Sequence, residues 1–340
     1  MKKPTMQDIA DELNVSRNTI SRALRNKNGV SEQTKREVKA IAERIGYIYN
    51  KDKVEEAKSG SKHFILLVSS FAITQTGFFG IIIEELKDIV KENKDTIEVI
   101  EIPRDNIEQQ TLILSKIKKY TSELTGIFIL SHITNEFIEN IINLKYPTVL
   151  IDHHSPKLKT DSVVSQNEFG TYDLVDYLIK QGIKEIGFIG NTSLSPSYRE
   201  RYIGYRQALE DHSLAFDSSY VISDIQEEQK ALFERISNLD KMPESWFCVN
   251  SGLAFILNTY LHSKGFSVPE DVSIVCFDDT DFSRQSSPPI TCVGTDLKLL
   301  AKISYSRMGY RLLNPEESYT EIRILPEFYE RASVLKSHTD

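Results

Sequence analysis

Three observations predict a small all-α helix-turn-helix head joined to a two-lobed α/β body of doubly wound parallel sheets. The first 50 residues hold three short helical patterns separated by turn residues. From residue 63 onward, buried strands and amphipathic helices alternate in two successive series. Charge divides at the same place, because residues 1–50 carry a net charge of +4 and the other 290 residues carry −12. We therefore expect a head at 1–50, a linker at 51–62 and a body at 63–340.

The composition indicates a globular protein of the cytoplasm. Hydrophobic residues make up 40% of the 340 positions and charged residues 26%. The longest apolar runs are far shorter than the ~20 residues that a membrane span needs. The basic start MKKPTMQDIADEL lacks the apolar core of a secretory signal. Three scattered cysteines predict small buried residues rather than a disulfide framework or a thiolate zinc site, and these are Cys248, Cys276 and Cys292.

Each helix of the head begins after a hydroxyl residue that can cap it. Asp8 stands three residues after Thr5, as the partner of a capping box does. Apolar residues recur on one side of each helix, so the three helices can share a core. Two short helices joined by a tight turn and braced by a third make a helix-turn-helix. The predicted helices are 6–13 after Thr5, 17–24 after Ser16 and 32–46 after Ser31.

The second helix of the head carries side chains that can read DNA bases. In a helix-turn-helix this helix enters the major groove, where arginine pairs with guanine and asparagine with adenine. Hydroxyls and N–H groups at helix starts can hold phosphates. Spacing alone leaves another interpretation open, in which these residues form the solvated polar face of a small packing domain. The candidate DNA contacts are Arg17, Asn18, Ser21 and Arg22 on the helix, and Thr5, Ser16 and Ser31 at helix starts.

The body alternates buried strands with helices, as parallel α/β sheets do. Ligands of such sheets bind at the carboxyl ends of the strands, so a cleft between two lobes is the expected site. The first series of strands is predicted at 64–70, 96–102, 126–130 and 147–152, and the second at 162–166, 184–190, 219–224, 246–250 and 272–278. Helices are predicted between them at 80–93, 106–120, 134–144, 171–182, 198–211 and 253–265.

The order of motifs resembles the lactose-repressor-like (LacI/GalR) family over nearly the whole chain. The matching pieces are VSRNTISRAL, GVSEQTKREV and IGYIYN in the head, and TGFFGIIIEELK, VLIDHH, RERYIGYRQAL and VPEDVSIVCFDD in the body. The resemblance implies a DNA-binding head in which Arg17 and Asn18 are variable base readers. Arg22 corresponds to the recurring arginine of the recognition helix. The resemblance also implies an effector body with the fold of periplasmic sugar-binding proteins.

The same resemblance implies which residues line an effector pocket. Aromatic rings can stack on the C–H face of a sugar or on a base, and carboxylates can accept hydrogen bonds from hydroxyls. Two positions depart from the family pattern: Ser251 stands where an aspartate is common, and Cys276 stands where glycine is usual. An uncharged group should hold hydroxyls less strongly than a carboxylate. The implied effector contacts are Phe78, Phe79, Asp152, Arg201, Ser251 and Asp279.

The linker also departs from the family pattern. Family members carry a leucine here that wedges into the minor groove and bends the DNA. In KDKVEEAKSGSK the corresponding position lies near Glu56, beside Glu55, where a carboxylate would face a groove lined by phosphates. We therefore expect no leucine wedge. The simpler interpretation of the segment is a plain flexible connector.

No sequence motif points to catalysis, a metal or another cofactor. The sequence contains no GxSxG elbow, HExxH helix or GxxxxGK[ST] phosphate loop. Asp152, His153 and His154 are consecutive, but neighbouring side chains on an extended segment point to opposite sides. A metal needs three or four converging ligands. We therefore expect neither an enzyme nor a metal site.

The sequence predicts a sequence-specific transcription regulator, a repressor, whose operator affinity is set by a small molecule. Its expected partners are a palindromic double-stranded DNA operator, a carbohydrate effector and a second copy of the chain. A nucleoside-like ligand or a protein partner are alternatives to the carbohydrate. Release of DNA and binding of DNA both stay open as the response to the effector. A solute-binding transport protein would share the body, but the basic head and the missing export signal argue against it.

Overall fold

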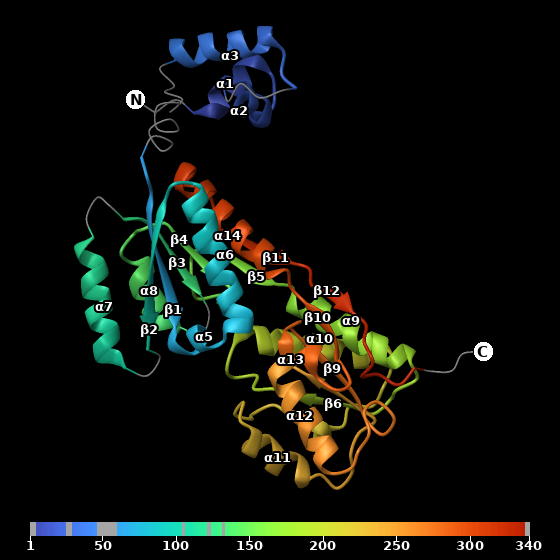
Figure 1. Cartoon of the computed structure of the whole chain (residues 1–340). Coiled ribbons are helices and arrows are strands. Elements are labelled where there is room, and N and C mark those ends of the chain that lie inside the picture. The colour runs from blue at the N-terminus through green and yellow to red at the C-terminus, as the bar shows by residue number, and fades with distance from the viewer. Residues whose placement is uncertain are drawn as a thin grey trace. The chain divides into compact units, whose positions relative to one another are not determined.

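The computed structural model describes residues 5–24, 29–45, 60–103, 106–120, 124–130 and 133–336 (Figure 1). The chain separates into two compact units, Met1–Ser61 and Lys62–Asp340. Residues 51–59 of the expected linker, with Glu55 and Glu56, lie outside the described residues. The expectation of a missing leucine wedge therefore stays a prediction. Across the described ranges, no helix combines the length and the apolar character that crossing a membrane requires.

The first unit consists of three short helices around a small apolar core. The capping box predicted at Thr5 is present, since the Thr5 N–H donates to Asp8 Oδ2 at 2.6 Å and the Asp8 N–H donates to Thr5 Oγ1 at 3.4 Å. Asn14 ends the first helix in the left-handed conformation, with φ of 51°. The third helix ends at Arg44, two residues before the predicted end. The helices are α1 (Met6–Leu13), α2 (Arg17–Leu24) and α3 (Glu32–Arg44), and the core contains Ile9, Ala10, Ile20, Ala23, Leu24, Val38 and Ala42.

The first lobe of the second unit is a six-stranded parallel sheet that is covered on both faces. Leu66 of strand β1 packs with helices α6 and α14, and the next residue, Leu67, packs with helices α7 and α8. Burial on both faces explains why the strands are continuous apolar runs. The strand order is β11-β5-β4-β3-β1-β2. The elements are β1 (His63–Ser69), α5 (Ser70–Thr74), the π-helix η1 (Thr76–Gly80), α6 (Ile81–Glu92), β2 (Thr96–Ile102), α7 (Ile107–Lys119), β3 (Leu124–Leu130), α8 (Asn135–Ile142), β4 (Thr148–Ile151), β5 (Asp161–Ser165), α14 (Leu297–Leu313) and β11 (Glu321–Ile324).

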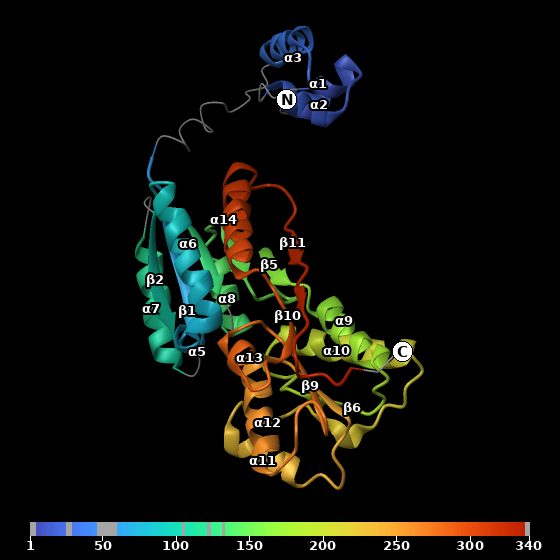
Figure 2. The ribbon, with the colours of Figure 1, turned by 45° about the vertical axis from the view of Figure 1, so that its right-hand side comes forward.

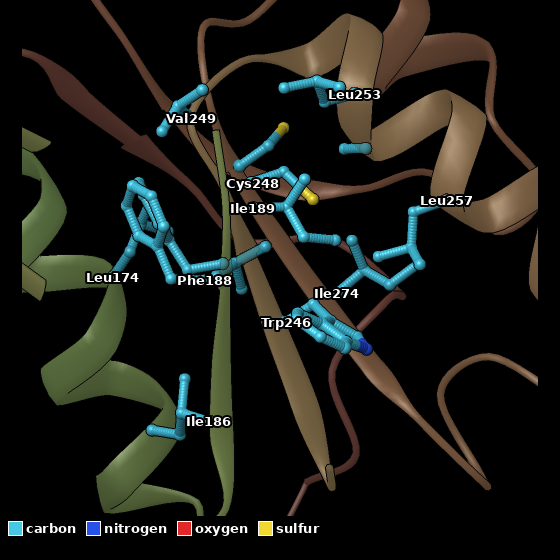
Figure 3. Close-up of a cluster of buried hydrophobic side chains, with 14 of the residues drawn as sticks. Leu174, Ile186, Phe188, Ile189, Trp246, Cys248, Val249, Leu253, Leu257 and Ile274 are labelled. Carbon is cyan, nitrogen blue, oxygen red and sulfur yellow. The ribbon is translucent and has the colours of Figure 1, made fainter. Parts of the chain in front are cut away.

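The second lobe holds a six-stranded sheet in the order β12-β10-β9-β8-β6-β7, in which only β12 runs antiparallel to its neighbour. Trp246 of β8 is fully buried against β6 (Figure 3). Gly187 makes room for it, because a Cβ there would lie 2.3 Å from the indole ring. The three cysteines are free and buried. The elements are α9 (Asn167–Lys180), β6 (Ile186–Ile189), α10 (Pro196–Asp211), the 3-10 helix η2 (Ser218–Tyr220), β7 (Val221–Ile222), α11 (Gln229–Ser237), β8 (Ser245–Cys248), α12 (Ser251–Ser263), β9 (Ser273–Phe277), α13 (Asp281–Gln285), β10 (Thr291–Gly294) and β12 (Glu327–Tyr329).

The chain crosses between the two lobes three times within the described residues. It leaves the first lobe after β5, returns for α14 and β11, and crosses again to supply β12 (Figure 2). The strand predicted at 162–166 therefore does not belong to the second series, because β5 pairs with β4 and β11 in the first sheet. The pattern of a buried strand is the same in either sheet, so the sequence does not reveal which sheet it joins.

Candidate functional site

Helix α2 exposes its polar side chains and buries its apolar ones. Arg17, Asn18 and Arg22 are exposed and Ser21 is half-buried, while Ile20 contributes to the core of the head. The outward side of a helix that follows a tight turn is the side that can enter a major groove. The structure therefore places the four candidate base contacts on one accessible helix.

The three candidate phosphate contacts are cap residues whose hydroxyls are already bonded within the head. Ser16 Oγ accepts the N–H of Thr19 at 3.1 Å, and Ser31 Oγ accepts the N–H of Thr34 at 3.0 Å. Thr5 donates both its N–H and its hydroxyl to the Asp8 carboxylate, at 2.6 and 2.7 Å. A carboxylate at that helix start repels a phosphate, so Thr5 is the weakest of the three candidates.

A cavity of about 120 Å³ lies where strands of the body end, and both lobes line it. Phe78, Phe79 and Asp152 come from the first lobe, and Arg201 and Ser251 from the second. Five of the six candidate effector residues are thus brought together at one place. The lining also includes Phe71, Tyr198, Glu227, Asn250, Asp278 and Phe282.

The π-helix η1 positions the two phenylalanines. Phe79 is 5% exposed and packs into the core of the first lobe, whereas Phe78 is half-buried. Their rings meet edge to face with centroids 4.9 Å apart, and the Phe71 ring lies 6.3 Å from that of Phe79. Because Phe79 is mostly a core residue, Phe71 and Phe78 offer the larger aromatic surface to a ligand.

Arg201 is held in place by several groups of the protein itself. Its Nε donates to Asn167 Oδ1 at 2.9 Å, and its Nη1 donates to the Val249 carbonyl oxygen. Its terminal nitrogens lie 3.3 and 3.4 Å from the Asp278 carboxylate. The guanidinium carbon is 3.7 Å from the centroid of the Phe277 ring, and the residue is 2% exposed. Arg201 is therefore a structural part of the second lobe as well as a wall of the cavity.

Asp152 is a carboxylate in an unfavourable environment. It follows β4 in the left-handed conformation, with φ of 52°. Burial raises its pKa to about 7, the charge of Arg201 opposes this shift, and the Asp278 carboxylate adds to it. Its Oδ1 is buried and accepts no hydrogen bond from any residue of the described ranges. A ligand that donates to this oxygen would remove the cost of an unsatisfied buried acceptor.

Asp279 does not line the cavity, and the neighbouring Asp278 stands in the place predicted for it. Asp279 instead binds Arg331 Nη2 at 2.8 Å and Arg284 Nη1 at 3.4 Å. Asp278 adopts φ of 73° at the end of β9, and consecutive side chains there point to opposite sides. The prediction from the FDD motif is therefore displaced by one residue.

Sequence reasoning missed a hydrogen-bonded trio on the cavity wall. Tyr198 donates its hydroxyl to Glu227 Oε1 at 2.7 Å. Asn250 Nδ2 donates to Glu227 Oε2 at 3.0 Å and to the Tyr198 hydroxyl oxygen at 2.6 Å. Glu227 precedes α11 in an irregular loop, where no periodicity signals a role. Tyr198 could have been found, because it lies one helical turn before Arg201 on α10.

The two consecutive histidines have different partners. His153 lines the cavity, and its Nε2 lies 3.3 Å from Asn135 Oδ1. His154 Nε2 lies 2.9 Å from Glu200 Oε1, which Arg323 Nη2 also approaches at 2.8 Å. Since Glu200 belongs to the second lobe and its two partners to the first, this cluster ties the lobes together. In the part of the chain that the structure describes, no group of three or more His, Cys, Asp or Glu side chains could hold a metal.

We expect Asp152→Asn to stabilise the body at pH 8. The folded-state pKa of about 7 exceeds the ordinary value of 3.8, so ionisation of Asp152 disfavours the folded state as the pH rises between these values. Asparagine does not ionise, and the free energy of unfolding should increase by roughly 1–3 kcal/mol at pH 8. The gain should shrink toward pH 5. Urea unfolding of both proteins at several pH values measures this difference. A gain that is independent of pH would contradict the raised pKa of Asp152.

Both units match known proteins. Residues 5–50 match the family model for bacterial regulatory proteins, lacI family, and residues 175–334 match that for a periplasmic binding protein-like domain. The probable HTH-type transcriptional repressor ExuR of Bacillus subtilis (strain 168) is 26% identical over 345 residues, which covers 98% of this chain and 99% of the relative. The transcriptional regulator CelR in complex with cellobiose aligns with a TM-score of 0.70 at 20% identity, over 97% of this chain and 99% of that one. The lac repressor dimer bound to operator and the anti-inducer ONPF aligns with a TM-score of 0.70 at 20% identity, over 98% and 100%.

A helix-turn-helix head and a two-lobed ligand-binding body define a DNA-binding transcription regulator with an effector domain. Relatives such as ExuR are transcription regulators, so the prediction that the chain is not an enzyme is confirmed. The chain belongs to the lacI family of bacterial regulatory proteins.

Proposed function

We propose that the chain is a repressor that binds a palindromic operator as a homodimer and responds to a carbohydrate held between the lobes of its body. The observation that carries this proposal is the exposed basic helix α2 in one unit together with an effector cavity in the other. Residues 1–50 contact DNA, 51–62 form the linker, and 63–340 bind the effector and the second copy. Such a protein acts in the cytoplasm, where its operator is.

In this proposal α2 reads the bases of the operator. Arg17 and Arg22 pair with guanine and Asn18 with adenine in the major groove. The head has a net charge of +4 and the rest of the chain −12, so attraction to DNA is concentrated in the head. A dimer presents two copies of α2 to two half-sites, which suits a palindromic operator. The lac repressor structure of similar fold is a dimer bound to operator.

A carbohydrate suits the chemistry of the cavity. Phe71 and Phe78 can stack on the C–H faces of a sugar, and Asp152, Glu227 and Asn250 can bind hydroxyls. CelR, which is similar in fold, was solved as a complex with cellobiose. The cavity of about 120 Å³ favours a small molecule over a segment of a protein partner.

Control of DNA binding would follow from closure of the cavity around its ligand. Contacts that the ligand makes only in the closed form shift the equilibrium toward that form, by no more than the difference in affinity between the two forms. His154 and Arg323 of the first lobe both bind Glu200 of the second, so a rotation of the lobes has to change these contacts. The linker would then transmit the rotation of the lobes to the head.

We expect Arg22→Ala to weaken operator binding by about 10–100-fold, because a bidentate arginine–guanine contact contributes about 1–3 kcal/mol. The matched control is Arg36→Ala, which removes an exposed positive charge from α3, where Arg36 Nε donates to the Glu32 carbonyl oxygen at 3.3 Å. Fluorescence anisotropy with a duplex selected by the parent protein, and with a scrambled duplex, separates base reading from general attraction. Equal losses for the two variants would rule out base reading by Arg22.

A further inference from the structure

The effector cavity has an excess of negative charge. Asp152, Glu227 and Asp278 line it, and Arg201 is the single Lys or Arg among the lining residues in the described part of the chain. Among the described residues of the lining, the one histidine is His153. Three carboxyl groups therefore face one ligand-sized space together with one permanent positive charge, and a bound cation would favour the ionised form of Asp152, whose pKa burial raises to about 7.

Arg201 already has its counter-charge. Its terminal nitrogens lie 3.3 and 3.4 Å from the two oxygens of Asp278, and its remaining contacts are with the protein. Arg201 acts on Asp152 only through its charge, and no other Lys or Arg lines the cavity in the described ranges to pair with Asp152 or Glu227. Negative charge in a partly buried site is costly until a positive group or several hydrogen-bond donors pair with it.

Asp152 and Glu227 are placed so that their oxygens can accept hydrogen bonds from a ligand. Asp152 Oδ1 is buried and has no hydrogen-bond partner among the described residues. Tyr198 and Asn250 donate to the two oxygens of Glu227 and fix its orientation. A ligand with an N–H donor can complete both groups, whereas a ligand with a carboxylate or phosphate meets like charge.

Aromatic rings add a second attraction for positive charge. Phe71, Phe78, Phe79, Tyr198 and Phe282 all contribute to the lining of the cavity. The negative face of an aromatic ring attracts an ammonium group, and rings combined with carboxylates attract it more strongly than either alone.

We propose that the effector carries a protonated amine, as an amino sugar does, and that this amine binds Asp152. The inference rests on the proposed carbohydrate effector and makes its chemical class more specific. Uronates and sugar phosphates are excluded by the same excess of negative charge. A neutral sugar leaves this charge unpaired and binds more weakly than its amino counterpart.

Isothermal titration calorimetry of the full-length protein at pH 7 tests this choice with matched sugars. The first trio is glucose, glucosamine and glucuronate, and the second is galactose, galactosamine and galacturonate. In at least one trio we expect the amine to bind about tenfold or more tightly than the neutral sugar, and the acid to give no measurable binding.

Two variants locate the amine. Asp152→Asn should remove the advantage of the amine over the neutral sugar, because the ratio of the two affinities depends on the charge that this carboxylate offers to the amine. Asp281→Asn is the matched control, because this carboxylate on α13 is outside the cavity lining and its side chain is 76% exposed. The control should keep the full advantage.

The failures of the two proposals are distinguishable. If the neutral or the acidic sugar binds as tightly as the amine, or if Asp152→Asn keeps the advantage, the amine inference is wrong and the carbohydrate effector stands. If no member of either trio binds while operator binding is intact, the carbohydrate effector is wrong and the amine inference falls with it.

Discussion

Replacing Asp161 with alanine is expected to lower the free energy of unfolding of the body by about 3–5 kcal/mol. Asp161 begins β5 and is fully buried. Arg311 Nε donates to its carboxylate at 2.7 Å, Arg307 Nη2 lies 2.7 Å away, and the Thr320 N–H donates at 2.9 Å. Alanine would leave two buried guanidinium groups without a counter-charge, which is costlier than the loss of the pair itself.

The pKa of Asp161 provides a second test of its role as the counter-charge of Arg307 and Arg311. Burial alone would raise this pKa, but hydrogen bonds from Arg311, Thr320 and Arg307 outweigh it, and the net shift is downward. A lowered folded-state pKa contributes stability above the ordinary pKa of 3.8, and this contribution is lost as the pH falls through the folded-state value. The difference in stability between the parent and Asp161→Ala should therefore narrow in acid.

Urea unfolding followed by circular dichroism measures the effect of Asp161→Ala. The control is Asp88→Ala, which removes an exposed carboxylate from α6 and should change the free energy of unfolding by no more than about 0.5 kcal/mol. A loss below about 1 kcal/mol for Asp161→Ala would mean that the two arginines find other partners or water, and that the cluster does not fasten α14 to the first sheet.

Arg201→Ala is expected to have a comparable effect, a loss of about 3–5 kcal/mol in the free energy of unfolding. The substitution leaves Asp278 and the Val249 carbonyl oxygen without the donor that now binds them, and it uncovers the Phe277 ring. Loss of effector response in this variant would therefore not by itself establish a contact between Arg201 and the ligand. The structure makes Arg201, which the family resemblance implied as a ligand contact, a support of the second lobe as well.

A double-mutant cycle separates the ion pair from the rest of the Arg201 contacts. If Asp278 is the main partner, Arg201→Ala combined with Asp278→Ala should be less destabilised than the sum of the two single variants, by about 1–3 kcal/mol. Urea unfolding of the four proteins gives this coupling energy. Simple additivity would show that the 3.3 Å contact contributes little and that the bonds to Asn167 and Val249 dominate.

Local signals in the sequence were sufficient for most of the head. The helices predicted at 6–13 and 17–24 have these bounds in the structure, because a cap residue stands directly before each start. The strand predicted at 96–102 also has these bounds. Capping and strand periodicity depend on neighbouring residues, so they can be recognised without knowledge of the rest of the fold.

The C-terminal part of the body could not be predicted in the same way. Helix α14 buries Ser304 and Arg311 beside Leu300 and Ala301, so polar residues interrupt its inner side. The strands β11 and β12 have four and three residues and stand at sheet edges, where exposed and half-buried residues alternate irregularly. Their place in the fold depends on pairing with distant strands, and no short stretch of sequence records that pairing.

The structure brings most of the candidate effector residues to one cavity and leaves one of them outside it. Five of the six residues that the family resemblance implied line the cavity. Asp278 lines the cavity in place of Asp279, because consecutive side chains point to opposite sides and the FDD motif alone does not show which carboxylate faces the cavity. Glu227 was missed because it stands in a loop, and its role depends on Tyr198 and Asn250, which are distant in sequence.

The three crossings between the lobes also determine when each part of the chain can fold during synthesis. The head needs only the residues up to Arg44, so it can fold while the ribosome is still making the body. Neither sheet is complete before β11 (Glu321–Ile324) and β12 (Glu327–Tyr329) have been made. A chain that stops before residue 321 would therefore combine a finished DNA-binding head with two sheets that expose unpaired edges. Such a fragment keeps the part that finds DNA and lacks the completed body that senses the effector, so it could occupy DNA without responding to the effector.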